Sequence, residues 1–454
     1  SNNGTWIAYH LKPGKGDQKL CVHQASNKLK MVFDRAEKSR FTADSRQLIF
    51  RQKLALDSLN QLRRQKLKKA KWPKDTLVIV DLKKQETIQI PHVLSYKVPE
   101  KWSGWLCYVA ASVPLKKDTS SSLKLAVSSK KTNEDNGHHL ILHKLSNQQE
   151  DTLPYVLDYR LSESGASMIY HTSGKDSLQK EGLYYYDFKS KKSTLMHASV
   201  ADYAQMSIDK NGEKVVFLVD VSSDTDALEL HDLYYWEMGL DTAECKLRSS
   251  DLMVGQQQLL SANAVLRFSD DANSFYFGIA DIPLLPDSNL LPEEQVQVEI
   301  WHYQNGRLHT QQNAELKRDK KRSYLAVYQT KTNQWKALAS KAVNQITITE
   351  KADATWALGR SSEPYEQLIS WEGYPRRQDI YSINTQTGQR QLAASNIKGT
   401  VGLSAKGHYL YWYNALDSTW YAYSNAEKTS LALSQFIPTS MADERNDVPN
   451  VPYA

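Results

Sequence analysis

Serine hydrolase chemistry is the first reaction to look for in this sequence, because it depends on a short motif. Gly-x-Ser-x-Gly places a serine on a strained turn that exposes its hydroxyl as a nucleophile. The nearest segments, 402–406 (Gly-Leu-Ser-Ala-Lys) and 359–363 (Gly-Arg-Ser-Ser-Glu), both lack the final glycine. The sequence also contains no phosphate-binding loop and no dinucleotide fingerprint. It therefore predicts no catalytic residue and no cofactor in this chain.

Residues that could bind a metal ion occur in three places. His138, His139 and His143 are close in sequence, but they lie in a strand-like run, without a helical pair or a cysteine partner. The acidic runs 220–226 and 270–271 do not follow the alternating pattern of a calcium-binding loop that ends in Glu. Ordinary strand and turn positions are therefore favoured, and no metal site is predicted.

The composition indicates a folded, β-rich protein. Of 454 residues, 41% are apolar and 24% charged, and the 25 Tyr and 11 Trp favour strands. The net charge of +6 is small for this length, and no run reaches the roughly 18 apolar residues of a membrane span. The three cysteines cannot form a full disulfide framework, and Cys21 and Cys107 are predicted to be buried as small hydrophobic residues.

Residues 54–71 are predicted to form a short helical insertion that Pro73 ends. It combines leucines and basic residues at Leu54, Leu59, Leu62, Leu67, Arg63, Arg64, Lys66, Lys68, Lys69 and Lys71. A nucleic-acid module would need more than one such cluster. A solvated helix face is therefore favoured, with no nucleic-acid partner.

A loose repeat organises the rest of the chain. Each copy is a strand, a turn of Ser, Asp, Asn or Gly, and a second strand with alternating large apolar residues. Clear copies are 40–50, 206–217 and 266–277, and weaker ones are 96–108, 159–170, 346–358 and 403–412. A further strand and a short return strand follow, as at 76–82, 183–188 and 379–384. The alternation predicts that one face of each strand enters the core.

The repeat spacing favours an all-β propeller of four-stranded antiparallel blades. Turn centres run from Gly4 to Gly407 at about 58 residues each, against roughly 40–50 for a blade, which indicates insertions such as 118–137 and 281–295. We expect one β-propeller over 1–454, seven- or eight-bladed and incomplete at both ends, with a β-sandwich pair as the alternative. A long insertion, 304–323, is expected between strands at 299–303 and 324–328.

Several motifs in order resemble those of large secreted bacterial serine peptidases of the prolyl oligopeptidase and dipeptidyl-peptidase IV-like clan. The similarity runs along essentially the whole chain. The motifs lie at 5–9, 16–17, 40–45, 72–77, 298–301, 311–312, 324–327, 364–365, 371–373 and 379–381, with a similar tail at 443–450.

The resemblance implies the N-terminal propeller region of such a peptidase. In that family an α/β-hydrolase domain with Ser, Asp and His follows the propeller, so the implied partners are that C-terminal domain and a peptide substrate. The propeller would limit access to the active site and help to bind the peptide. A periplasmic or extracellular location is implied as well. We expect a fragment of a peptidase; a natural relative without the catalytic half is the alternative.

The resemblance also directs attention to substrate-binding residues. Dipeptidyl-peptidase relatives bind the free amine of the substrate with paired Glu residues, whereas Glu293 and Glu294 lie in a proline-containing loop typical of a solvated turn. Trp371, Glu372, Arg376 and Arg377 are the substrate-binding candidates, because they cluster in a polar loop between strands. An ordinary blade hairpin with exposed charges is the alternative.

A second class of function stays open at this point. A propeller that has no catalytic partner acts as a stand-alone binding module for proteins or glycans. A Gly-x-Ser-x-Gly motif downstream of residue 454, followed by Asp and His, would indicate the peptidase, and a stop codon there would indicate the binding module.

Overall fold

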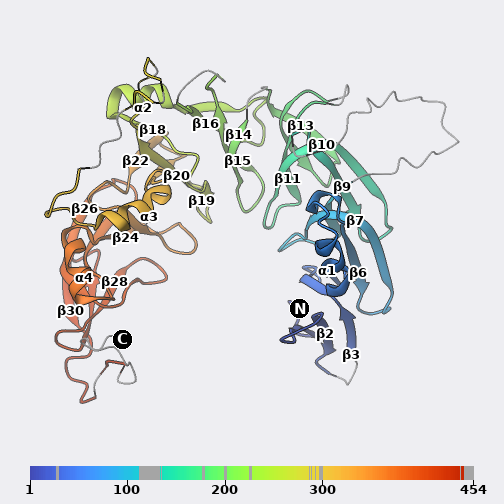
Figure 1. Cartoon of the computed structure of the whole chain (residues 1–454), viewed down its shortest axis with the longest axis horizontal. Helices are drawn as coiled ribbons and strands as arrows, with labels where there is room; N and C mark the ends of the chain where they lie inside the picture. The colour runs from blue at the N-terminus through green and yellow to red at the C-terminus, as the bar shows by residue number, and fades with distance from the viewer. Residues whose placement is uncertain are drawn as a thin grey trace. The chain divides into compact units, whose positions relative to one another are not determined.

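A computed structural model describes residues 1–454 except 27–29, 112–132, 134, 176–178, 199–201, 224–227, 286, 288, 292, 296–299, 440 and 444–454. The described chain is mostly β-strand, with a few short helices (Figure 1). It forms two compact units. The first contains 1–201, 210–215 and 236–243, and the second contains 202–209, 216–235 and 244–454. The predicted all-β class is confirmed.

The first unit begins with a three-stranded antiparallel sheet of β1 (Trp6–Leu11), β2 (Lys19–Gln24) and β3 (Lys30–Asp34). A continuous antiparallel meander then runs from β4 to β13. Its strands are β4 (Ala36–Phe41), β5 (Gln47–Gln52), β6 (Asp75–Asp81), β7 (Thr87–Lys97), β8 (Trp105–Ala110), β9 (His138–Lys144), β10 (Glu150–Leu161), β11 (Ser167–Thr172), β12 (Gly182–Asp187) and β13 (Lys192–His197).

The long strands β7 and β10 divide this meander into four-stranded sheets. The first part of β7 pairs with β6 and its last part with β8, and β10 is shared between β9 and β11 in the same way. The pairing register shifts within both strands, next to His92 (φ 59°) and Tyr155 (φ 52°). Such irregularities bend a strand. Each long strand therefore ends one four-stranded sheet and begins the next.

Further four-stranded antiparallel sheets follow in chain order. In one of these sheets two short strands, β18 and β19, pair with the same edge of β20. Together they take the position that a single first strand has in the other sheets. The sheets are β14 (Tyr203–Ile208), β15 (Lys214–Asp220), β16 (His231–Glu237) and β17 (Glu244–Arg248); β18 (Gln258–Leu260), β19 (Arg267–Phe268), β20 (Ser274–Asp281), β21 (Tyr324–Gln329) and β22 (Gln334–Ala337); β23 (Gln345–Thr347), β24 (Trp356–Ser361), β25 (Arg377–Asn384) and β26 (Arg390–Lys398); and β27 (Val401–Leu403), β28 (Tyr409–Asn414), β29 (Thr419–Ser424) and β30 (Thr429–Ala432).

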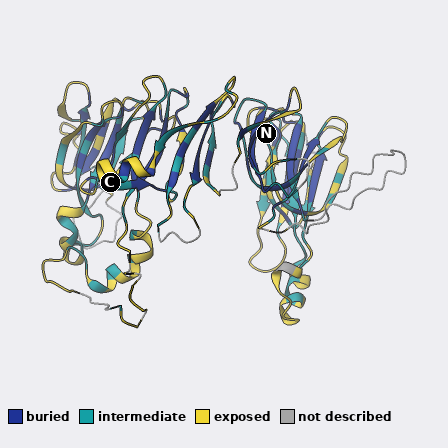
Figure 2. Cartoon of the chain, turned by 90° about the horizontal axis from the view of Figure 1, so that it is seen from above, coloured by how far each residue is buried: buried dark blue, intermediate teal, exposed yellow. Residues whose placement is uncertain are grey.

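Most of the inner strands bury both of their faces, and this corrects the expectation that only one face of each strand enters the core. The strand β28 keeps one exposed face, at Tyr409 and Tyr411. In β5, Leu48 and Phe50 belong to one apolar cluster and Ile49, on the opposite face, belongs to another. In β9, Leu142 and Ile141 are divided in the same way. Figure 2 shows the buried inner strands between exposed loops. Each such sheet therefore packs against a neighbour on both sides, as propeller blades do.

The repeated polar turn is built by side-chain hydrogen bonds. In the turn before β5, Gln47 N donates to Thr42 Oγ1 (3.1 Å), and the Thr42 hydroxyl donates to Asp44 (2.7 Å). Ser269 and Asp271 repeat both contacts before β20. The fourth residue has positive φ in five of these turns, at Ser45, Gly212, Ala272, Ala352 and Gly407. The repeat seen in the sequence is therefore a repeated hydrogen-bonded turn.

Two insertions contain helices. Residues 54–71 hold α1 (Leu56–Arg64) and the 3-10 helix η1 (Lys69–Lys71), which confirms the predicted helical insertion. The long insertion 304–323 contains α3 (His309–Asp319). The strand predicted at 299–303 is wrong over 300–303, because these residues form no strand, and residue 299 lies outside the described residues. A run of five residues is too short for periodicity alone to distinguish a strand.

Other predicted features are only partly described. The segment 118–137 and the tail 443–450 fall mostly outside the described residues. In the described part of the chain, no helix has the length and apolar character needed to cross a membrane. The blade number and the single propeller over 1–454 stay predictions.

Candidate functional site

The four predicted binding residues lie on a helical excursion between β24 and β25, in the second unit. It consists of η2 (Glu363–Leu368) and α4 (Ile369–Glu372), followed by Gly373 and a cis Tyr374–Pro375 bond. Pro364 stands in the first turn of η2, where its missing N–H is tolerated. The excursion is therefore more than the tight hairpin of an ordinary blade.

Glu372 and Arg377 hold the excursion to the sheet. Arg377 Nε donates to Glu372 Oε2 (2.6 Å), and Lys398 Nζ lies 3.5 Å from the same oxygen. Lys398 is buried on β26 and also donates to the backbone oxygen of Glu372 (3.2 Å). The hydrogen bond from Arg377, assisted by Lys398, holds the pKa of Glu372 below its ordinary value. This carboxylate is therefore already neutralised by two cations.

Trp371 and Arg376 are arranged differently. The Trp371 side chain is 88% exposed, and Tyr374 is 65% exposed. The Arg376 guanidinium lies over the Tyr374 ring, 5.5 Å from its centroid, and donates to its hydroxyl (3.2 Å). Trp371 therefore offers a free aromatic face, and Arg376 offers a cation fixed by Tyr374. The structure thus separates the four candidates into an anchoring pair, Glu372 and Arg377, and a surface pair, the exposed Trp371 and the half-buried Arg376.

Sequence reasoning missed the ion-pair network that supports the excursion. Arg307 donates to Glu315 Oε2 and Asp319 Oδ2 on α3, both at 2.7 Å, and Glu366 on η2 lies 4.0 Å away. The hydrogen bond to Arg307 lowers the pKa of Glu315. These contacts join α3 to η2. The charges alternate in sequence, but no local signal indicates that they converge.

A second contact anchors η2 to β25. The Tyr365 hydroxyl donates to Asp379 Oδ1 (2.7 Å), which also accepts the backbone N–H of Asn396 (3.0 Å). Burial, together with the bond to Asp379, raises the pKa of Tyr365 to about 12. Tyr365 therefore stays protonated at neutral pH and serves as a structural hydrogen-bond donor.

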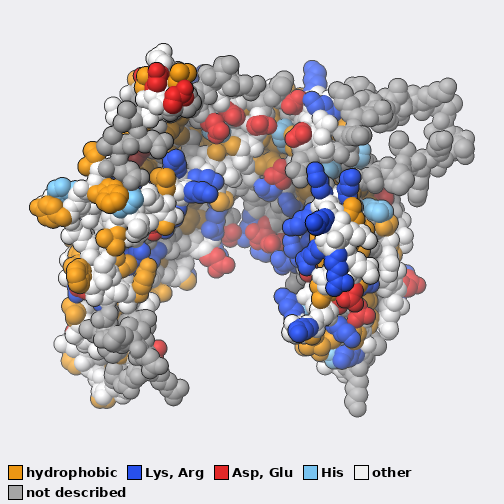
Figure 3. Space-filling model, in the orientation of Figure 1, with side chains coloured by type: hydrophobic (Ala, Val, Ile, Leu, Met, Phe, Trp, Pro, Cys, Tyr) orange, Lys and Arg blue, Asp and Glu red, His pale blue; other side chains and the backbone are white. Residues whose placement is uncertain are grey.

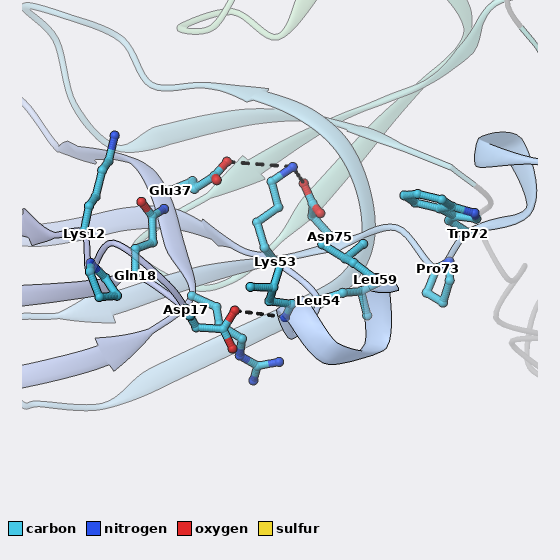
Figure 4. Close-up of a pocket in the computed structure, with 14 residues that line it drawn as sticks. Lys12, Asp17, Gln18, Glu37, Lys53, Leu54, Leu59, Trp72, Pro73 and Asp75 are labelled. Atoms are coloured by element: carbon cyan, nitrogen blue, oxygen red, sulfur yellow. Dashed lines mark hydrogen bonds and ion pairs between the residues drawn. The ribbon is translucent and has the colours of Figure 1, made fainter. Parts of the chain in front are cut away.

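The first unit contains a pocket of about 550 Å³ beside α1, where Lys and Arg side chains gather on the surface (Figure 3). Figure 4 shows Lys53 extended between two carboxylates. Its Nζ lies 3.0 Å from Asp75 and 3.8 Å from Glu37. Asp17 accepts the backbone N–H of Leu56 (2.9 Å) and so holds the start of α1. The polar groups of this pocket mostly satisfy one another, and no activated nucleophile lines it.

Two of the histidines at 138–143 contact neighbouring side chains of the protein. His143 is buried, and its Nδ1 lies 2.9 Å from Glu150, which also accepts the Tyr108 hydroxyl (2.8 Å). His139 packs against the Tyr155 ring. Among the described residues, no group of three or more His, Cys, Asp or Glu side chains could hold a metal ion.

The strand pairing thus defines an all-β protein built from sheets of the propeller-blade type. Its sequence matches no family model and no curated protein. Similar solved structures include the β-propeller domain of the trilobed protease from Pyrococcus furiosus, at 10% identity and a TM-score of 0.33, covering 87% of this chain and 95% of that chain. A prolyl endopeptidase is similar at 9% identity and a TM-score of 0.35, covering 95% of this chain and 48% of that chain.

A eukaryotic initiation factor is also similar, at 8% identity and a TM-score of 0.42, covering 95% of this chain and 86% of that chain. Peptidases of the kind that the sequence resembles are thus among the similar structures, at low identity. The chain spans about half the length of the prolyl endopeptidase chain.

Proposed function

We propose that the chain is the non-catalytic propeller part of a serine peptidase, which gates access and helps to bind peptides for a C-terminal α/β-hydrolase domain. The main support is the excursion between β24 and β25, since it presents an aromatic face and a fixed cation from a sheet of the blade type. The sequence motifs that carry the resemblance include this same excursion, 371–373. A nucleophile elbow is missing from the sequence, so the chemistry belongs to the partner domain.

The surface pair, Trp371 and Arg376, suggests how a peptide is held. The Trp371 ring offers apolar contact area to a side chain or a proline ring of the peptide. Arg376 donates charge-assisted hydrogen bonds to a peptide carbonyl or a terminal carboxylate. Glu372 is neutralised by Arg377 and Lys398, so it is not the group that binds a substrate amine.

The test uses the full-length protein and proline-containing chromogenic peptides. Trp371→Ala is expected to raise KM about 5- to 30-fold with kcat nearly unchanged, because the ring binds ground state and transition state alike. Phe436→Ala removes an aromatic side chain that is 90% exposed elsewhere in the second unit, and is the matched control. Equal KM and kcat values for Trp371→Ala and wild type would show that Trp371 does not bind the peptide.

The 454-residue chain alone is expected to leave these peptides uncleaved. Turnover that survives repurification and is blocked by a serine-directed inhibitor would refute the non-catalytic role. The open reading frame beyond residue 454 gives an independent check, through the presence or absence of Gly-x-Ser-x-Gly.

A stand-alone binding module for proteins or glycans is the second candidate. The observation that favours it is the 88% exposure of Trp371, because exposed aromatic residues often anchor binding partners. Calorimetric titration of the chain with peptides and with oligosaccharides distinguishes the two. Saturable oligosaccharide binding that Trp371→Ala abolishes would favour the module.

A further inference from the structure

The insertion between β5 and β6 concentrates positive charge. The basic segment, residues 63–74, contains Arg63, Arg64, Lys66, Lys68, Lys69, Lys71 and Lys74. Within residues 54–74 the only acidic residue is Asp57, so this stretch carries a net charge of +6, equal to that of the whole chain. The remaining sequence therefore has no net charge, and the excess positive charge of the chain lies in residues 54–74.

The structure leaves these cations open to solvent. Six of these cations are exposed, and Lys74 is half-buried. Among the described residues none of the seven forms a salt bridge, although Arg63 donates to the Asn60 amide oxygen (3.3 Å). By contrast, Lys53, just before the insertion, is paired with Asp75 and Glu37. Figure 3 shows the resulting gathering of Lys and Arg side chains over α1.

Apolar side chains accompany the charge. Leu56 and Leu67 are 36% and 38% exposed, and no residue of α1 is buried. Trp72 is half-buried, and its Nε1 donates to the backbone oxygen of Leu67 (2.9 Å), which places the indole beside the leucine. The insertion thus combines a short amphipathic helix, α1, with the lysines and the tryptophan that follow it. Basic amphipathic segments with leucine and tryptophan are typical of those that lie in the interface of a membrane.

We propose that the basic segment docks the protein onto the surface of an anionic lipid bilayer. Lysines predominate among its cations, and a lysine acts as a point charge toward headgroups without needing planar bidentate partners. The partly exposed leucines favour a bilayer over a nucleic acid, which offers phosphates but no apolar layer. This inference does not depend on the proposed peptidase role.

The test is flotation of the 454-residue chain with vesicles of phosphatidylcholine containing about 30% phosphatidylglycerol. We expect the protein to float with these vesicles, to stay behind with pure phosphatidylcholine vesicles, and to detach in about 0.5 M NaCl, where screening is strong. A lack of binding to the anionic vesicles would overturn the proposal and leave the segment as a solvated face.

Two triple variants with equal charge change locate the effect. Lys66, Lys69 and Lys71 are changed to Gln in one, and Lys317, Lys320 and Lys321, exposed at the end of α3, are changed to Gln in the other. The first is expected to lower the partition coefficient at least about tenfold and the second less than about twofold, because only the first touches the bilayer. Matching circular dichroism melts show that both variants are folded.

Two results would contradict the assignment. An equal loss in both variants would mean that net charge alone drives vesicle binding. Tighter binding to a short DNA duplex than to the anionic vesicles, lost in the first variant, would identify a nucleic-acid surface instead.

Discussion

At the scale of single residues, Glu372 was predicted from the sequence to bind substrate, and in the structure it connects elements of the fold. It links α4 to β25 through Arg377 and to β26 through the buried Lys398. A charge on Lys398 is tolerated at this depth because the carboxylate is near. The neighbouring residues Trp371, which is exposed, and Arg376, which is half-buried, do not make these contacts and carry the proposed binding.

Glu372→Gln is expected to destabilise the protein by about 1–3 kcal/mol at pH 7, because Lys398 loses its compensating charge. Thermal unfolding measures the change. Glu427→Gln, at an exposed turn residue, is the control and is expected to be neutral. Equal melting of Glu372→Gln and wild type would show that the ion pair contributes nothing.

The lowered pKa of Glu372 implies that the stability of the protein depends on pH. The pKa of Glu372 is lower in the folded protein than its ordinary value of 4.5, so the unfolded chain takes up a proton first as pH falls. The stability contributed by Glu372 is therefore present above pH 4.5 and lost as pH falls through the lower, folded pKa. Melting curves from pH 6 to about pH 3 should fall less steeply for Glu372→Gln than for wild type. Parallel curves would contradict this.

At the scale of elements, the repeated turn fixes where each inner strand begins. In five copies its fourth residue adopts positive φ, and at one of them, Gly212 (φ 77°), a Cβ atom would lie 1.9 Å from Ser167 Oγ. Ser167 is buried, and its hydroxyl donates to Gly212 O (3.2 Å). The glycine is therefore required both by backbone conformation and by space.

Gly212→Ala is expected to lower the free energy of unfolding by about 1–3 kcal/mol, through left-handed strain and the displaced serine. Gly14→Ala is the matched control, because a Cβ there meets nothing within 4 Å and its φ is not positive. Chemical denaturation of both variants gives the comparison. A Gly212→Ala midpoint as high as that of Gly14→Ala would show that the turn adapts freely.

At the scale of the whole molecule, burial on both faces of the inner strands makes each sheet depend on its neighbours within a unit. Cys107 illustrates this, since it is fully buried in β8, and burial raises the pKa of its thiol. Cys21 is also buried, while Cys245 on β17 is partly exposed. All three are free thiols, and the prediction that Cys21 and Cys107 are buried is confirmed.

Thiol titration reports this protection. A thiol reagent should modify Cys245 faster than Cys21 and Cys107 in the native protein and all three after denaturation, because access to the two buried thiols requires opening of the sheets. Cys245→Ser should abolish the fast reaction. Fast reaction of two or three thiols in the native protein would mean that the sheets around Cys21 or Cys107 open readily.

Much of the fold followed from local sequence. Period-two alternation and the turn residues indicated the four-stranded sheets, and the clustered leucines and lysines indicated the helical insertion at 54–71. These features are local, because backbone conformation and turn chemistry act over a few residues. The short run at 299–303 had too few residues to separate a strand from a loop, and there the prediction was wrong over 300–303.

Only the tertiary structure decided which faces are buried and which polar residues are committed to the fold. Sequence alternation indicated one core face, whereas stacking within each unit buries both. Sequence proximity grouped Trp371, Glu372, Arg376 and Arg377. The contact of Glu372 with Lys398, which is distant along the chain, distinguishes the anchoring pair from the surface pair. The reason is physical: hydrogen bonds and ion pairs form between residues that strand pairing brings together, and strand pairing joins segments far apart in sequence.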